Sequence, residues 1–282
     1  MKEHTFIFSR ISETYKTEGI SGIRRRGWEK IRYNVQQWTF RPYRIKKEIC
    51  GETIDLLIAD PCAKSWYDRA HEWPELVWLK EHALQTDDIV VDCGAHHGLT
   101  TVLFSKWAYT GKVFGYEAHP RNAEVARKNI ANNRSHNAHI RHSAVGHSVG
   151  TVQISNHSNS AFLDDKDANG IHVPMVTLDS EFLSLAPTFI KIDVEGQELN
   201  VLKGASRILQ SRPKLDIEIH CSLLADPPNE IRDILDRISI GNYEAFVQLT
   251  VDGPIEEYDP ELHTDVYISQ HEVVHLFCLT RR

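Results

Sequence analysis

Val90-Val91-Asp92-Cys93-Gly94-Ala95-His96-His97-Gly98 is the stretch that decides the fold of this chain. The apolar residues before Asp92 predict a buried strand, and the glycines predict a turn into a helix that begins near Leu99. Glycine lets the backbone turn tightly and approach a ligand without a Cβ in the way. In a parallel α/β sheet such a turn lies at the carboxyl edge, where nucleoside-bearing ligands bind.

The spacing of the glycines narrows the kind of ligand. A dinucleotide site requires Gly-x-Gly-x-x-Gly, whereas Ala95 and His96 follow Gly94 here, so an NAD-linked oxidoreductase is disfavoured. What remains is Asp-x-Gly-x-x-x-Gly, and a carboxylate at the strand end suits a zwitterionic ligand with an amino group. We therefore expect the cofactor to contact Asp92, Gly94, Ala95, His96 and Gly98.

The second strand also ends in a carboxylate. Glu117 follows an apolar run, and Pro120 opens the next helix. A carboxylate in this position accepts hydrogen bonds from both hydroxyls of an adenosine ribose. The alternative is a side chain that interacts with the helix dipole, but the glycine turn one strand earlier favours the ribose. Ala118 in the same turn, and Ser143 and Ala144 after the third strand, are the expected neighbours of the adenosine.

The run Phe189-Ile190-Lys191-Ile192-Asp193-Val194-Glu195-Gly196-Gln197-Glu198 predicts a third strand of the same kind. Three carboxylates within six residues are costly to bury unless they bind a cation or belong to a network. For Glu198 the simpler interpretation is a charge at a helix N-terminus. Asp193 is expected to face the same crevice as Asp92 and Glu117, because it occupies the equivalent strand end.

These three blocks, together with Leu202-Lys203-Gly204-Ala205, resemble the FkbM family of S-adenosylmethionine-dependent methyltransferases. The resemblance extends over residues 50–280, because Trp66-Tyr67 and Trp73-x-Glu75 also fit the start of that family's domain. It implies a seven-stranded Rossmann-like sheet, S-adenosyl-L-methionine as cofactor, and O-methylation of a hydroxyl on a sugar, glycan or natural product. A non-catalytic nucleoside-binding or regulatory module remains the competing hypothesis.

Methyl transfer to a hydroxyl also requires a base within reach of the acceptor proton. The expected catalytic residues are Asp193, Glu195 and His220, with His96 or His97 as further candidates for the base. Thr101, or its neighbour Thr100, is expected to help bind the methionine carboxylate at the start of the helix. A metal-assisted variant would use Asp193, Glu218 and His220. The preferred interpretation is instead that Glu218 is paired within the sheet and that the site holds no metal.

Short apolar runs alternate with helical patterns from residue 88 onward, which indicates an α/β, doubly wound, mostly parallel sheet. The pieces 243–249 and 272–280 predict two strands without a helix between them, closing the sheet as an antiparallel C-terminal hairpin. Residues 150–177 predict a hairpin excursion whose polar middle, Asn156 to Asn169, is a candidate lid. The expected strands are 89–93, 112–117, 138–143, 188–193 and 214–219, and the expected helices are 99–108, 120–132, 198–209 and 228–239.

The chain divides by charge into two parts. Residues 1–50 carry a net charge of +7, whereas the whole chain carries −7. We therefore predict a basic N-terminal extension and lead-in over 1–85, with a strand at 52–60 and a helix start at Trp73-Pro74, followed by a class I methyltransferase domain over 86–282. The basic amphipathic helix expected at 20–38 would bind an anionic membrane surface or mediate self-association.

The composition narrows the compartment and the partners. The five cysteines form no Cys-x-x-Cys pair, which argues against a disulfide framework or a zinc knuckle. No apolar stretch is long enough to cross a bilayer, and the N-terminus lacks the apolar core of a signal peptide. We expect a cytoplasmic enzyme, membrane-peripheral at most, that acts on a small-molecule or glycan acceptor. No nucleic-acid-binding module is visible, so no nucleic-acid partner is expected.

Overall fold

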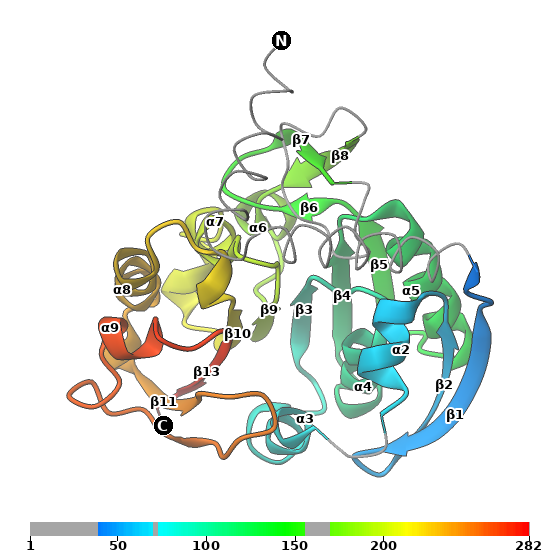
Figure 1. Cartoon of the computed structure of the whole chain (residues 1–282), viewed down its shortest axis with the longest axis horizontal. Helices are drawn as coiled ribbons and strands as arrows, with labels where there is room; N and C mark the ends of the chain where they lie inside the picture. The colour runs from blue at the N-terminus through cyan, green and yellow to red at the C-terminus, as the bar shows by residue number, and fades with distance from the viewer. Residues whose placement is uncertain (1–38, 70–72, 156–169, 282) are drawn as a thin grey trace, which may run out of the picture.

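The computed structural model describes residues 39–69, 73–155 and 170–281 (Figure 1). Its main sheet has the strand order β12-β11-β13-β10-β9-β3-β4-β5. The five strands from β10 to β5 are parallel, and β13 is antiparallel to both of its neighbours. The bounds are β3 Ile89–Cys93, β4 Lys112–Glu117, β5 Ala138–His142, β9 Phe189–Ile192, β10 Lys214–Ile219, β11 Tyr243–Gln248, β12 Glu256–Glu257 and β13 Val274–Thr280.

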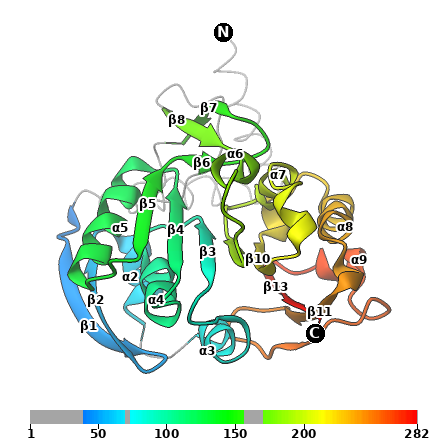
Figure 2. The same cartoon turned by 180° about the vertical axis from the view of Figure 1, so that it is seen from behind.

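This arrangement confirms the predicted Rossmann-like sheet, with the two-residue strand β12 as an addition at one edge. Helices cover both faces (Figures 1 and 2). The helices α4, Leu99–Trp107, and α5, Pro120–Asn132, follow the first two strands. The helices α7, Glu198–Lys203, and α8, Pro227–Ile238, cover the opposite face. The first two helices therefore lie on one face and the later two on the other, as in a doubly wound sheet.

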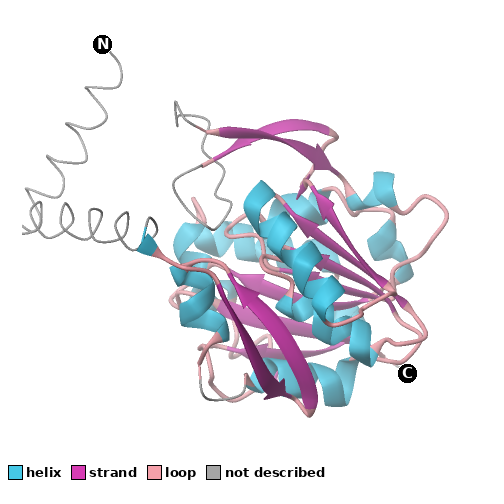
Figure 3. Ribbon diagram, turned by 90° about the vertical axis from the view of Figure 1, so that its right-hand side faces the viewer, coloured by secondary structure: helices cyan, strands magenta, loops and turns pink. Residues whose placement is uncertain are grey.

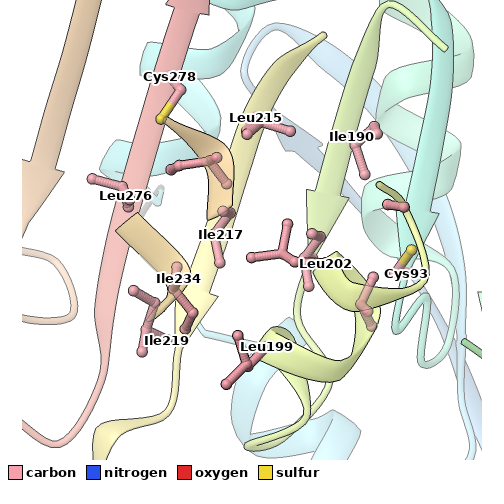
Figure 4. Packing of buried hydrophobic residues seen from close by; sticks show 14 of the residues in the cluster. Cys93, Ile190, Leu199, Leu202, Leu215, Ile217, Ile219, Ile234, Leu276 and Cys278 are labelled. Atoms are coloured by element: carbon pink, nitrogen blue, oxygen red, sulfur yellow. The ribbon is translucent and has the colours of Figure 1, made fainter. Parts of the chain in front are cut away.

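Side chains on successive strand positions enter different cores, because they point to opposite faces of the sheet. Val91 and Cys93 belong to the cluster beneath α7 and α8, which Figure 4 shows from close by. Val90 belongs to the second cluster, which also contains Phe104 of α4 and Phe277 of β13. The near-continuous apolar sequence of β3 is therefore explained by burial on both faces.

A hairpin formed by β1, Tyr43–Ile49, and β2, Glu52–Ile58, lies outside α5 (Figure 3). Asn129 of α5 accepts a hydrogen bond of 2.6 Å from the backbone N–H of Leu57. Strand β2 was predicted from the sequence and β1 was not. The lead-in continues through α2, Pro61–Tyr67, and α3, Pro74–Trp78, which begins at the predicted Trp73-Pro74 step.

The lead-in shares its core with the main sheet. Ile54 and Leu56 of β2 and Leu76 of α3 belong to the same buried cluster as Val90 and Val113. The domain boundary between residues 85 and 86 therefore remains a prediction, because apolar packing is continuous across it.

A small sheet of β6, Ala144–Val145, β8, Ile171–Val176, and β7, Gly150–Ile154, lies beyond the carboxyl end of β5 (Figure 1). The antiparallel pair β7–β8 confirms the predicted hairpin excursion. The loop at its tip, the candidate lid at 156–169, lies outside the described residues. The excursion returns to the main sheet through the short helix α6, Leu178–Glu181.

Two details of the C-terminal half differ from the prediction. Helix α7 ends at Gly204 rather than near residue 209. Between β11 and β13 the chain forms the short helix α9, Asp265–Ile268, where no helix was expected. The side chain of Thr264 accepts a hydrogen bond from the backbone N–H of Tyr267, so a local cap supports a helix too short for an apolar period to show.

The predicted basic helix at 20–38 lies outside the described residues. Within 39–69, 73–155 and 170–281, no helix combines the length and the apolar character needed to cross a membrane.

Candidate active site

A cavity of about 300 Å³ opens at the carboxyl ends of β3, β4, β9 and β10. The small sheet and the lead-in segments α2 and α3 contribute further walls. Most of the residues that the sequence marked meet here: Gly94, Ala95, His96, Glu117, Ala118, Ser143, Ala144, Asp193, Glu195 and His220 all line it. Asp92 and Thr101 support these residues from behind the cavity wall, as described below. Gly98 does not line the cavity; it has a φ of +80° and forms the N-cap of α4.

The glycine turn joins β3 to both neighbouring strands. The backbone N–H groups of Gly94 and Ala95 each donate a hydrogen bond of 2.9 Å to the carbonyl of Tyr116. Gly94 has a φ of +88°, and a Cβ at this position would lie 1.7 Å from the backbone oxygen of Asp193. A residue with a Cβ does not fit there, so the turn fixes the distance between the carboxyl ends of β3 and β9.

Asp92 organises the start of α4 from beneath the cavity. Its fully buried carboxylate accepts hydrogen bonds from the hydroxyls of Thr100, at 2.8 Å, and Thr101, at 2.5 Å. Burial raises the pKa of Asp92. Thr100 lines the cavity, whereas Thr101 is wholly buried. Of the two threonines predicted as partners of a ligand carboxylate, Thr100 is the one with access.

Glu117 presents a buried carboxylate at the end of β4. It accepts hydrogen bonds from the backbone N–H groups of His96, at 2.8 Å, and His119, at 2.7 Å. Burial raises the pKa of Glu117 to about 7. Each carboxylate oxygen has a second lone pair, so the side chain is fixed in orientation and still able to accept from a ligand.

The two histidines of the glycine turn connect it to α2. Tyr67 of α2 lies with its hydroxyl 2.6 Å from Nδ1 of His96. The His96 and His97 rings are stacked, with centroids 4.3 Å apart and planes within 5°. His97 Nε2 lies 2.9 Å from the carboxylate of Asp60, which also caps α2 through the backbone N–H of Ala63. Burial lowers the pKa of His96 to about 3, so its ring is neutral.

Lys191 is a buried cation that sequence reasoning missed. In the sheet register it lies between Asp92 of β3 and Asp216 of β10. Its Nζ lies 2.9 Å from Asp193 Oδ2 and 3.7 Å from Glu218 Oε2. Burial lowers the pKa of Lys191, but Asp193, Glu218 and the other carboxylates outweigh it and raise the pKa well above its ordinary value. A lysine inside an otherwise apolar strand was the available signal.

His220 lies among carboxylates at the end of β10. Its Nδ1 is 3.0 Å from Glu198 Oε1, and Glu198 is fully buried. Burial lowers the pKa of His220, but the hydrogen bond that it donates to Glu198 and the charge of Asp193 outweigh this effect and raise the pKa to about 10. Glu198 therefore does more than the helix-terminal role expected of it. In the ligand-free protein His220 keeps its proton at neutral pH.

Glu218 and His275 extend this cluster to β13. His275 lies with Nε2 3.5 Å from Glu218 and Nδ1 3.4 Å from Asp216. Burial, and then the charge of Asp193, raise the pKa of Glu218 to about 7. From the sequence, Glu218 was considered only as a metal ligand or as a structurally paired side chain. The sequence gave no signal for His275, because β13 joins the sheet out of sequence order.

Two indole rings line the cavity, and an ion pair lies beside them. Arg69 lies 4.6 Å from the ring centre of Trp73 and 6.0 Å from that of Trp66. Its guanidinium donates two hydrogen bonds, of 2.9 and 3.2 Å, to Asp252 in the loop after β11. We call Trp66, Arg69, Trp73 and Asp252 the mouth clasp. It joins segments 183 residues apart in sequence.

Comparison with known protein families finds one that matches this chain. Residues 92–245 match the methyltransferase FkbM domain. No curated protein matches the sequence.

Solved structures are similar to this chain at low identity. The methyltransferase FkbM from Methylobacillus flagellatus KT is 21% identical with a TM-score of 0.47; the match covers 68% of this chain and 44% of that protein, so this chain spans less than half of its length. The precorrin-6y C5,15-methyltransferase from Geobacter metallireducens GS-15 is 14% identical with a TM-score of 0.43, covering 73% and 86% of the two chains. M. jannaschii TYW2, solved in complex with AdoMet, is 12% identical with a TM-score of 0.43, covering 86% and 89%.

Proposed function

Because the chain belongs to the FkbM methyltransferase family, we propose that it transfers a methyl group from S-adenosylmethionine to a hydroxyl of a sugar, glycan or natural product. The observation that carries this proposal is Glu117. It is a buried carboxylate, already oriented by two backbone N–H groups, that lines the same cavity as the glycine turn. A side chain in this state is suited to accept hydrogen bonds from the ribose hydroxyls of the cofactor.

The residues present fit the remainder of the cofactor. The glycine turn, held against the carbonyl of Asp193, lines the cavity, and Thr100 presents its hydroxyl oxygen to the cavity at the first turn of α4. Ser143 and Ala144 line the wall where the adenine would lie. When bound, the sulfonium cofactor supplies an activated methyl group, and the protein contributes orientation and exclusion of water.

The acidic cluster is suited to the acceptor. Methyl transfer from a sulfonium to a hydroxyl requires a carboxylate or imidazole that accepts the proton of that hydroxyl. His220 is protonated in the free protein, and Asp193 is held ionised by Lys191, with a pKa of about 2 despite the opposing effect of burial. Glu218 joins Asp193 as a candidate base, because its pKa of about 7 lies near the operating pH.

The mouth of the cavity supports an organic acceptor with both apolar and hydroxyl faces. Trp66 is 45% exposed and lines the cavity beside Trp73. Indole rings pack against the apolar faces of sugars and polyketides, while carboxylates accept from their hydroxyls.

Calorimetric titration with S-adenosylmethionine tests the cofactor assignment. The variant Glu117→Ala should bind about 10- to 100-fold more weakly than the wild type, because a charge-assisted hydrogen bond contributes about 1.5–3 kcal/mol. Glu124→Ala is the matched control, since Glu124 is an exposed carboxylate on α5 paired only with Lys128.

Unchanged affinity in Glu117→Ala would remove the ribose assignment. Transfer of a labelled methyl group to hydroxyl-bearing extracts then separates an enzyme from a nucleoside-binding module. Cofactor retained through purification, identified by mass spectrometry, distinguishes both from an NAD-linked enzyme.

A further inference from the structure

Three side chains of metal-ligand type converge at the carboxyl ends of β9 and β10. They are Asp193, Glu218 and His220, whose nearest ligand atoms lie within 4.8 Å of one another. His220 Nε2 lies 3.9 Å from Asp193 Oδ1 and 3.9 Å from Glu218 Oε1. Glu195 lies beside this group, with Oε2 3.6 Å from the same nitrogen.

These separations suit a shared ion better than direct contacts. They exceed hydrogen-bond length. Donor atoms about 2.1 Å from one cation lie about 3.0 Å apart at a right angle and about 3.6 Å apart at 120°, so a bound ion would draw the two pairs at 3.9 Å slightly together. His220 is only 8% exposed, yet among the described residues nothing hydrogen-bonds to its Nε2. This nitrogen faces the carboxylates of Asp193 and Glu218 from the cavity wall, which indicates a ligand between them, and an ion bound there would replace the proton that Nε2 carries in the free protein.

The other nitrogen of His220 is held as it is in metal sites. Nδ1 lies 3.0 Å from Glu198 Oε1, and the same oxygen accepts a hydrogen bond of 2.9 Å from the backbone N–H of Gly196. Histidines that bind metals commonly donate their second N–H to a carboxylate, which fixes the ring and turns the remaining lone pair toward the ion.

The cations already present occupy the opposite side of the carboxylates. Lys191 approaches Asp193 through Oδ2 and Glu218 through Oε2, and His275 approaches that same Oε2. Asp193 Oδ1 and Glu218 Oε1 are the oxygens turned toward His220. The cluster therefore presents one imidazole nitrogen and two carboxylate oxygens to a common point, while the far side of the two carboxylates is neutralised by Lys191 and His275.

We infer that Asp193, Glu218 and His220 bind a divalent metal ion of the Mn²⁺ type at this end of the cavity. One imidazole and two carboxylates, with water in the remaining positions, suit Mn²⁺. This replaces the sequence-based expectation that Glu218 serves only as a structural pair. A bound ion would polarise an acceptor hydroxyl; that role rests on the proposed methyl transfer, whereas metal binding itself does not.

A second group, Asp60, His96 and His97, also brings three ligand-type side chains together. Its geometry excludes a shared ion, because a metal lies in the plane of each imidazole that binds it. The two rings are parallel within 5° and their centroids are 4.3 Å apart, so no point lies in both planes. This group therefore serves as an internal comparison for the proposed site.

Titration of the metal-free full-length protein with Mn²⁺, followed by electron paramagnetic resonance of the free ion, tests the inference. We expect one bound ion per chain, and a loss of affinity of about tenfold or more in His220→Gln and in Glu218→Gln. Glu218→Gln keeps the size of a partly exposed side chain, so it remains informative if His220→Gln does not fold. Glu124→Gln is the matched surface control and should bind as the wild type does.

The absence of stoichiometric binding in the wild type, or equal affinity in the wild type and Glu218→Gln, would overturn the metal site. Affinity lost in His97→Gln but retained in His220→Gln would instead move the ion to the excluded group. Binding of S-adenosylmethionine to each variant, measured separately, reports on the proposed function, so failure of one is distinguishable from failure of the other.

Discussion

Glu117 has to be ionised to accept two hydrogen bonds from a ribose, yet its environment favours the proton. Burial raises the pKa of this carboxyl to about 7 in the free protein. A ligand that donates to the carboxylate stabilises the ionised form and lowers that pKa again. Cofactor binding is thus linked to release of a proton near neutral pH.

The linkage predicts that cofactor affinity depends on pH. Below a pKa of about 7 the free carboxyl is protonated, so affinity should fall as pH falls, by about tenfold per unit, and level off above neutrality. Calorimetry between about pH 5.5 and about pH 8 measures this slope. Glu117→Gln should bind weakly with a flatter profile, and an equal slope in that variant would assign the proton to another group.

At single positions, the sequence predicted residues whose role depends on their own strand. Glu117 and Asp193 were found because an acidic residue ends a strand and precedes a helix. Lys191 and His275 were missed because their partners are set by strand neighbours. Lys191 gains its meaning from Asp92 and Asp216 beside it in the sheet, which no local pattern encodes.

Helix α2 is positioned by one side chain with two tasks. Asp60 accepts a hydrogen bond of 2.8 Å from the backbone N–H of Ala63 and lies 2.9 Å from His97 Nε2. Burial raises the pKa of Asp60, but the contact with His97 outweighs it and lowers the pKa to about 2. The cap of α2 and the glycine turn are therefore fixed by the same carboxylate.

Asp60→Ala should lower the free energy of unfolding by about 2–4 kcal/mol, through a lost cap and a buried His97 left without its partner. Asp60→Asn keeps a capping oxygen and should cost about half as much. Urea denaturation followed by circular dichroism measures both. Equal losses of unfolding free energy in the two variants would show that capping of α2 by residue 60 makes no measurable contribution to stability.

Elements with a clear apolar pattern were predicted with the correct bounds, whereas β1 and α9 were not predicted. Strands 89–93, 112–117 and 214–219 and helix 120–132 have the bounds expected from their apolar patterns. Strand β1 was missed because its alternating sequence lies within a basic segment, and half of its face is exposed. Helix α9 has four residues, fewer than one apolar repeat of a helix, so only its cap could have marked it.

At the scale of the whole molecule, the mouth clasp connects the lead-in to the C-terminal part of the chain. Arg69 follows α2 in the lead-in, and Asp252 belongs to the C-terminal part that closes the sheet. Arg69 is largely buried between indole rings, whereas the carboxylate of Asp252 is 35% exposed. Solvent therefore screens the pair in part, and its contribution is modest.

A double-mutant cycle with Arg69→Gln and Asp252→Asn isolates this pair from the stacking of Arg69 on Trp73. We expect a coupling of about 0.5–1 kcal/mol in urea unfolding. The coupling should shrink between about 0.1 M and about 1 M salt, because ions screen exposed charges. Additive effects of the two substitutions would show that the clasp orders the mouth without stabilising the fold.

The close approach of Gly94 to the carbonyl of Asp193 constrains how this site could be redesigned. An added Cβ would lie 1.7 Å from that oxygen, so the residues proposed to face the cofactor and those proposed to face the acceptor form two halves of the site that meet at one rigid joint, the contact between Gly94 and Asp193. Neither half can shift to accommodate a larger substrate without breaking the turn. Changes of acceptor range are therefore expected in the walls around the joint, in the aromatic residues of the lead-in and in the small sheet, while the joint itself stays invariant under selection for new substrates.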